Sequence, residues 1–168
     1  MLIPGRLAYS LLGYGVALGL SVGALVWVAV RGPELIGLGT GQQVARGTVL
    51  GVHSTLLVVL FAIAPIGATW SDRLPGRVAV PNKEYWADGL NRDAFRLRFV
   101  ADVVRVCSLT GVAATAVLLG SVQATRVGGT LPVWAIGVVV LCLAVVVLLV
   151  RRMWRTGYTI PTDDADSA

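Results

Sequence analysis

Three ionisable residues lie inside the long apolar runs of this sequence, namely His53, Asp102 and Arg105. Ionisable side chains are costly to bury in apolar surroundings, so each of them marks a candidate functional position. His53 is the sole histidine, so one chain cannot supply two histidines for a helix-held haem or a full set of zinc ligands. Two interpretations of His53 remain. One is that it handles protons together with Glu34, and the other is that it makes an interfacial or interhelical hydrogen bond near the end of its run.

Asp102 and Arg105 are spaced i, i+3, which predicts an ion pair on one helix face. The alternative is a polar contact that docks this helix on a neighbour. Neither interpretation is catalytic, because an aspartyl protease inside a membrane needs two carboxylates and only Asp102 is in range. A serine protease pair of Ser108 and His53 is disfavoured as well. Ser108 is expected near the cytoplasmic side of the membrane and His53 near the outer side, because the second and third runs cross in opposite directions.

Cys107 and Cys142 lie in different runs and show no C-x-x-C spacing, so we expect two free, buried thiols. The sequence therefore predicts no catalytic residue, no metal ligand and no cofactor, and the protein is expected not to be an enzyme.

The elements that carry these residues are four long apolar runs. The chain of 168 residues is 56% hydrophobic and 14% charged, whereas a water-soluble domain carries about 25% charged residues. Each run is long enough to cross a hydrocarbon core of about 30 Å. The predicted spans are approximately 7–30, 48–70, 99–122 and 131–150.

These runs predict an all-α fold, an integral membrane four-helix bundle that forms one domain over residues 1–156. The first run is too long for the core of a signal peptide, so we expect it to be a retained span. Residues 157–168 are acidic and poor in apolar side chains, and we expect a disordered tail.

Glycine and proline suggest how the helices pack. Gly15, Gly19 and Gly23 are spaced by four, which predicts a helix face that another backbone approaches closely. Pro65 lacks a backbone N–H, so we expect a bend and a carbonyl that a neighbouring helix must satisfy. Pro132 is expected in the first turn of the fourth span.

The connections between the runs have their own signals. In residues 31–47, glycines at alternate positions disfavour a regular helix, so we expect a short polar loop. Within the central connection, residues 71–98, Asn91 is expected to cap a helix that begins at Arg92.

The basic residues are distributed unequally between the two sides of this arrangement. Eleven of the 14 lysines and arginines fall at the termini, in the central connection or beside it, and three fall in the other two loops. The positive-inside rule then places both termini and the central connection in the cytoplasm.

The central connection contains the run Pro81, Asn82, Lys83, Glu84, Tyr85, Trp86. One interpretation is a lipid anchor, with the aromatic rings at headgroup level and the basic residues on anionic lipid. The other is an interaction motif that contacts a protein partner or docks onto the inner face of the protein itself, with Asp102 as the carboxylate for Lys83.

This run resembles the Pro-Asn-Lys-Asp/Glu-Tyr-Trp signature of a broad family of small bacterial multi-spanning membrane proteins of unknown function. The domain of that family also occurs in SdpI-like immunity and signalling proteins. The resemblance covers mainly the C-terminal half of the chain. It implies a signature on the cytoplasmic side after the second span, with two further spans behind it.

We therefore expect a non-enzymatic, multi-pass protein of the bacterial inner (plasma) membrane that acts as an immunity-like, sensory or accessory component. The alternative is a small transporter or a lipid-binding membrane protein. The expected partners are the lipid bilayer and either a membrane-protein partner or further copies of the chain. No nucleic acid is expected, because the basic residues flank apolar runs rather than form one face.

Overall fold

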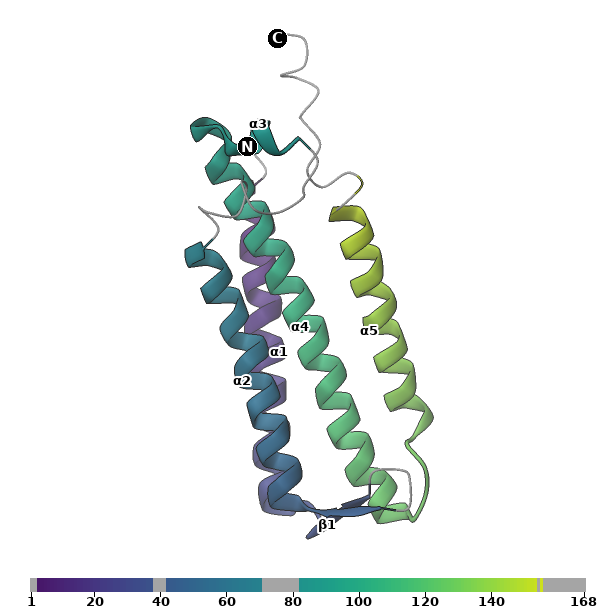
Figure 1. The fold of residues 1–168 in the computed structure, drawn as a ribbon. Coiled ribbons are helices and arrows are strands. Elements are labelled where there is room, and N and C mark those ends of the chain that lie inside the picture. The colour runs from purple at the N-terminus through teal and green to yellow at the C-terminus, as the bar shows by residue number, and fades with distance from the viewer. Residues whose placement is uncertain (1–2, 38–41, 71–81, 154, 156–168) are drawn as a thin grey trace.

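Four long helices run alongside one another in the computed structural model, which describes residues 3–37, 42–70, 82–153 and 155 (Figure 1). They are α1 (Ile3–Arg31), α2 (Arg46–Trp70), α4 (Gly89–Val127) and α5 (Val133–Arg152). All four are long and apolar enough to cross a membrane. The expected four-helix membrane bundle is confirmed, with α1 beginning and α5 ending at the same end.

Helix α4 is the centre of the bundle and packs against α1, α2 and α5. Its 39 residues correspond to a length of about 58 Å, roughly twice the hydrocarbon thickness. The helix ends where Gly128 adopts a left-handed φ of 69° and donates its N–H to the carbonyl of Ala124. The helix therefore extends beyond the predicted span 99–122 at both ends, because no residue interrupts it before Gly128.

The start of α4 also differs from the expectation. The helix begins at Gly89, with Asp88 in extended conformation at the N-cap. Asn91 donates its N–H to the carbonyl of Asp88 and lies in the first turn, so its expected capping role is wrong. Pro132 likewise lies at the N-cap of α5 rather than inside its first turn.

The face of α1 that packs within the chain is not the glycine face. The described residues that are buried on α1 are small or β-branched and lie on one side of the helix: Ser10, Ala17, Ser21, Ala24 and Val28. Gly15, Gly19 and Gly23 are exposed, and a Cβ atom built on any of them meets nothing within 4 Å. Among the described residues, no other helix of this chain packs on these three glycines, so their predicted packing face is not used within the bundle.

At the crossing of α1 and α4, two buried hydroxyls meet. Ser21 Oγ lies 2.8 Å from Thr115 Oγ1, and each hydroxyl also lies 2.8 Å from a carbonyl one turn earlier in its own helix. Two hydroxyl protons serve three hydrogen bonds, so one of the three is unmade at any instant. The pair nevertheless gives both buried hydroxyl groups a hydrogen-bond partner.

The carbonyl released by Pro65 has a partner from another helix. Residue 65 lies within α2, and without an N–H it leaves the carbonyl of Phe61 without its helical donor. The hydroxyl of Tyr14 in α1 donates to this carbonyl at 2.5 Å. Its ring meets that of Phe61 edge-on, with a centroid distance of 4.9 Å. The expected satisfaction of the carbonyl by a neighbouring helix is confirmed.

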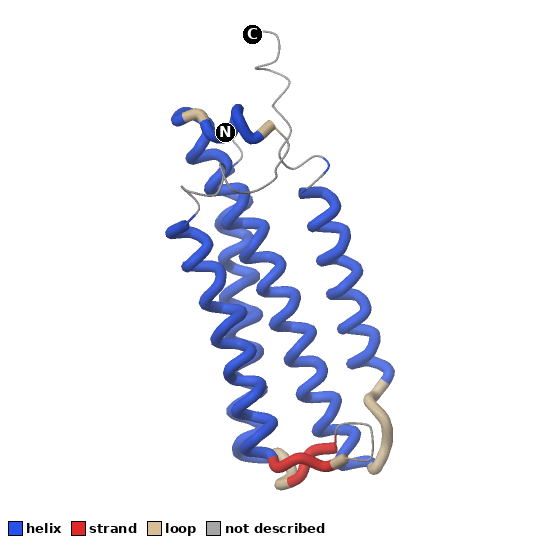
Figure 2. The backbone as a smooth tube through the Cα atoms, in the orientation of Figure 1, coloured by secondary structure: helices blue, strands red, loops and turns tan. Residues whose placement is uncertain are grey.

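The connection between α1 and α2, expected to be a polar loop without a regular helix, contains a small hairpin (Figure 2). Strand β1 (Leu35–Gly37) pairs antiparallel with β2 (Gln43–Ala45). Ile36 is fully buried beside residues of α1 and α4, and the N–H of Gly37 donates to Thr125 Oγ1 at 2.8 Å. The hairpin is stabilised by the end of α4, a contact that the loop sequence by itself does not reveal.

Candidate functional site

The end of the bundle opposite the hairpin carries a small aromatic cap. It is built from α3 (Lys83–Ala87) and the start of α4, with Met153 at the end of α5. Trp86 is 1% exposed and Phe95 is fully buried, and their ring centroids lie 6.1 Å apart. The guanidinium of Arg98 stacks on the indole of Trp86 at 5.1 Å. We call this group the aromatic cap.

Two turns in the chain fold α3 back onto α4. Asn82 precedes α3 in the left-handed region, with φ 56° and ψ 42°, a conformation that asparagine adopts more readily than most residues. The amide of Trp86 donates to the carbonyl of Asn82, and that of Asp88 donates to the carbonyl of Glu84. Asp88 then turns the chain into α4. As a result, Trp86 of the short helix α3 packs against Phe95 of α4.

Four of the charged side chains of this region face outward, whereas Arg98 packs on Trp86. Glu84, Asp88, Arg92 and Asp93 are all exposed. The cap therefore has an apolar interior and a charged exterior on an ordered backbone. The side chain of Lys83, expected near Asp102, lies outside what the structure describes.

Asp102 and Arg105 form the expected ion pair. An Arg105 nitrogen lies 3.3 Å from a carboxylate oxygen of Asp102, within one helix turn, and both side chains remain partly exposed. This pair lies toward the aromatic cap.

His53 lies near the other end, two turns into α2 from the hairpin. The ring is 8% exposed, and its Nε2 has no hydrogen-bond partner among the described residues. The expected hydrogen bond is thus not made at this nitrogen. The structure separates His53 from Asp102 and Ser108 along the bundle, so these three polar residues do not form one site.

The cysteines are buried and unbonded, as expected: Cys107 is 5% exposed and Cys142 is 7% exposed. Within the described part of the chain, no three His, Cys, Asp or Glu side chains come together as metal ligands.

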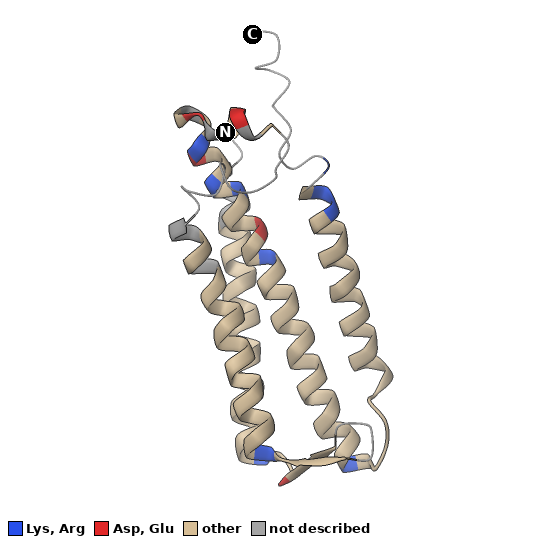
Figure 3. Cartoon of the chain, in the orientation of Figure 1, with Lys and Arg blue, Asp and Glu red and all other residues tan. Residues whose placement is uncertain are grey.

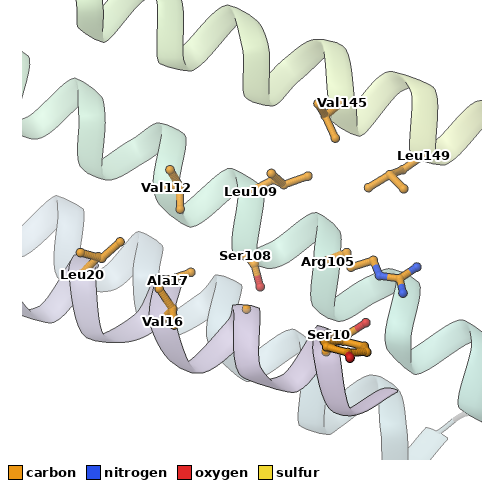
Figure 4. Close-up of a pocket in the computed structure, with 12 residues that line it drawn as sticks. Ser10, Val16, Ala17, Leu20, Arg105, Ser108, Leu109, Val112, Val145 and Leu149 are labelled. Atoms are coloured by element: carbon orange, nitrogen blue, oxygen red, sulfur yellow. The ribbon is translucent and has the colours of Figure 1, made fainter. Parts of the chain in front are cut away.

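A groove of about 430 Å³ lies on α4, between α1 and α5 (Figure 4). Its walls are nearly all apolar, and Arg105 lies at one end of it. Sequence reasoning missed this groove, because its three walls come from helices that are far apart in the chain. Of the residues that the sequence analysis considered, Arg105 and Ser108 line it.

The four apolar helices, with the hairpin at one end and the aromatic cap at the other, define a multi-span helical membrane protein. Comparison with protein-family models, with curated proteins and with solved structures gives no match for this chain.

Proposed function

We propose that the chain is a multi-pass protein of a bacterial inner membrane, with both termini and the aromatic cap in the cytoplasm. Figure 3 shows more basic residues at the cap end of the bundle than at the hairpin end. In the described ranges the cap end carries eight arginines and one lysine, which are Arg6, Lys83, Arg92, Arg96, Arg98, Arg105, Arg151, Arg152 and Arg155. The hairpin end carries Arg31, Arg46 and Arg126. This bias supports a cytoplasmic cap by the positive-inside rule.

Accessibility from outside the cell tests this orientation. Gln42 and Asn82 are exposed at opposite ends, and each is replaced by cysteine in a chain in which Cys107 and Cys142 are alanine. A membrane-impermeant maleimide should label Gln42→Cys in intact spheroplasts and label Asn82→Cys only after permeabilisation. Labelling of Asn82→Cys in intact spheroplasts would reverse the orientation.

Within that orientation, we propose a non-enzymatic, accessory role of the immunity-like or sensory kind, exercised by binding a membrane-protein partner at the cap. One observation carries this proposal, namely that Trp86 is buried inside the cap while four charged side chains face out. An interfacial lipid anchor requires its ring at the headgroup level, whereas a fixed charged exterior suits a contact between proteins.

The run Pro81–Trp86 supports the same proposal. Its position between the second and third spans is the one that the resembled family implies. Membership of that family is our proposal and rests on these six residues.

Site-specific photocrosslinking in cells tests the partner. A photoreactive amino acid at Glu84 should give one discrete adduct of constant mass, whereas the same group at Leu141 should not. Leu141 is 65% exposed on α5, so it is expected to face lipid. The charge reversal Asp93→Arg should weaken the adduct, and Glu34→Arg at the hairpin end should leave it intact. Equal products at both positions, or none at Glu84, would refute the proposed contact.

A further inference from the structure

The groove between α1 and α5 extends from the arginine-rich end toward the middle of the bundle. On α1 it is lined from Tyr9 to Leu20, and on α4 from Arg105 to Val112. The α1 stretch corresponds to about 16 Å, close to half of a hydrocarbon core of about 30 Å. The groove therefore has the length of one lipid leaflet.

The depth of the groove can be judged from α5. This helix has 20 residues from Val133 to Arg152, a length of about 30 Å that matches the hydrocarbon core. Leu149 and Val145 line the groove. Arg152 follows them at i+3 and i+7, on the same helix face at the membrane boundary.

The polar groups of the groove gather at this boundary end. Arg105 borders the groove there, with the hydroxyls of Ser10 and Ser108 close by (Figure 4). One guanidinium nitrogen of Arg105 forms the ion pair with Asp102. A guanidinium has five N–H donors, so this contact does not use all of them. Beyond this end, the inner half of the groove is lined by Val16, Leu20 and Val112.

We propose that this groove binds one anionic glycerophospholipid. One acyl chain lies along the apolar half, and the phosphate meets Arg105, with Arg152 adding positive charge. The basic residues of this end outnumber its described carboxylates. This positive charge is complementary to a phosphate and favours an anionic over a zwitterionic headgroup. This inference goes beyond the partner contact proposed above and uses a different surface of the protein.

Native mass spectrometry of the delipidated full chain in detergent tests the proposal. The probes are palmitoyl-oleoyl phosphatidylglycerol and phosphatidylcholine, which carry the same acyl chains. One phosphatidylglycerol should bind at a concentration about tenfold lower than phosphatidylcholine, the scale of one hydrogen bond between charged groups. Equal binding of the two lipids would overturn the proposed headgroup site.

A matched pair of glycine variants tests the location. Gly13 lines the groove and Gly19 does not, and a Cβ at either position meets nothing within 4 Å. Gly13→Leu should fill the groove and abolish binding of both lipids, whereas Gly19→Leu should bind like the wild type. Unchanged lipid binding by Gly13→Leu would overturn the proposal. A lipid-free dimer that Gly13→Leu converts to monomer would also overturn it, because a second copy would then occupy the groove.

The headgroup contact has its own test. Arg105→Gln should lower phosphatidylglycerol binding to the phosphatidylcholine level and leave phosphatidylcholine unchanged. The double variant Asp102→Asn, Arg105→Gln should show the same loss without leaving an unpaired carboxylate. If the double variant regains selectivity for phosphatidylglycerol, or if Arg105→Gln keeps it, the assignment of the phosphate to Arg105 is overturned.

Discussion

The glycines of α1 and those of α4 illustrate opposite uses of one residue type. On α1, Gly15, Gly19 and Gly23 have the regular spacing of a packing motif, yet they are exposed. On α4, Gly120 has no such spacing, yet a Cβ there would lie 2.7 Å from Cβ of Ala135 in α5. A Cβ at Gly111 would lie 3.1 Å from the ring of Phe61 in α2.

The difference shows that spacing alone does not locate a helix contact. A glycine matters where a neighbouring helix approaches closely, and that approach depends on which helix is central. Helix α4 is central, so its glycines meet neighbours on two sides. Helix α1 touches α4 through Ser21 and α2 through Tyr14, and its glycines lie on a face outside both contacts.

Among the substitutions that test this comparison, Gly120→Leu should lower the stability of the protein most. The added side chain has to enter space that Ala135 and Leu131 occupy, and we expect a loss of about 3 kcal/mol in the free energy of unfolding. Gly137→Leu on α5 is the matched control, because a Cβ there meets nothing within 4 Å. Denaturant titration in mild detergent measures both variants. Equal stabilities would show that α4 and α5 separate easily.

Tyr14→Phe should lower the free energy of unfolding by about 2 kcal/mol, because it leaves the carbonyl of Phe61 without a hydrogen-bond donor in an apolar part of the bundle. The cause can be isolated with Pro65→Ala, which restores a backbone N–H at residue 65. In that background, Tyr14→Phe should cost clearly less. The same penalty in both backgrounds would show that the hydroxyl stabilises something other than the carbonyl released by the proline.

Ser21→Ala should have a smaller effect, about 0.6 kcal/mol, the average for hydrogen bonds between membrane helices. The reason is that Thr115 keeps its bond to the carbonyl of Gly111 when Ser21 is lost. Ser54→Ala on α2 provides a comparison at a residue outside this pair. A penalty above that of Tyr14→Phe would mean that the hydroxyl pair, rather than the freed carbonyl, is the main polar contact of α1.

Gly19→Leu should have the smallest effect, within about 0.5 kcal/mol of the wild type, as for other exposed positions. Its Cβ position is open. The measurement is the same detergent titration, repeated at several protein concentrations. A loss that appears only at concentrations where the protein self-associates would show that a second copy packs on the glycine face.

Much of the fold follows from the sequence because the membrane imposes it. Runs of 20 or more apolar residues have to form helices, since backbone groups in hydrocarbon must be satisfied internally. The Asp102–Arg105 pair and the need for a donor to the carbonyl of Phe61 follow from residue spacing within one helix. Such features depend only on residues that are close together in the chain, so the sequence alone is enough to predict them.

The tertiary structure decided what depends on contacts between distant segments. Nothing local distinguishes Gly19 from Gly120, and only the packing of α5 on α4 makes the second one critical. The burial of Ile36 requires α4, and that of Trp86 requires Phe95 beyond a turn. The groove needs three helices at once. In apolar helices every face is compatible with lipid, so hydrophobic pattern fixes the spans but not which faces meet.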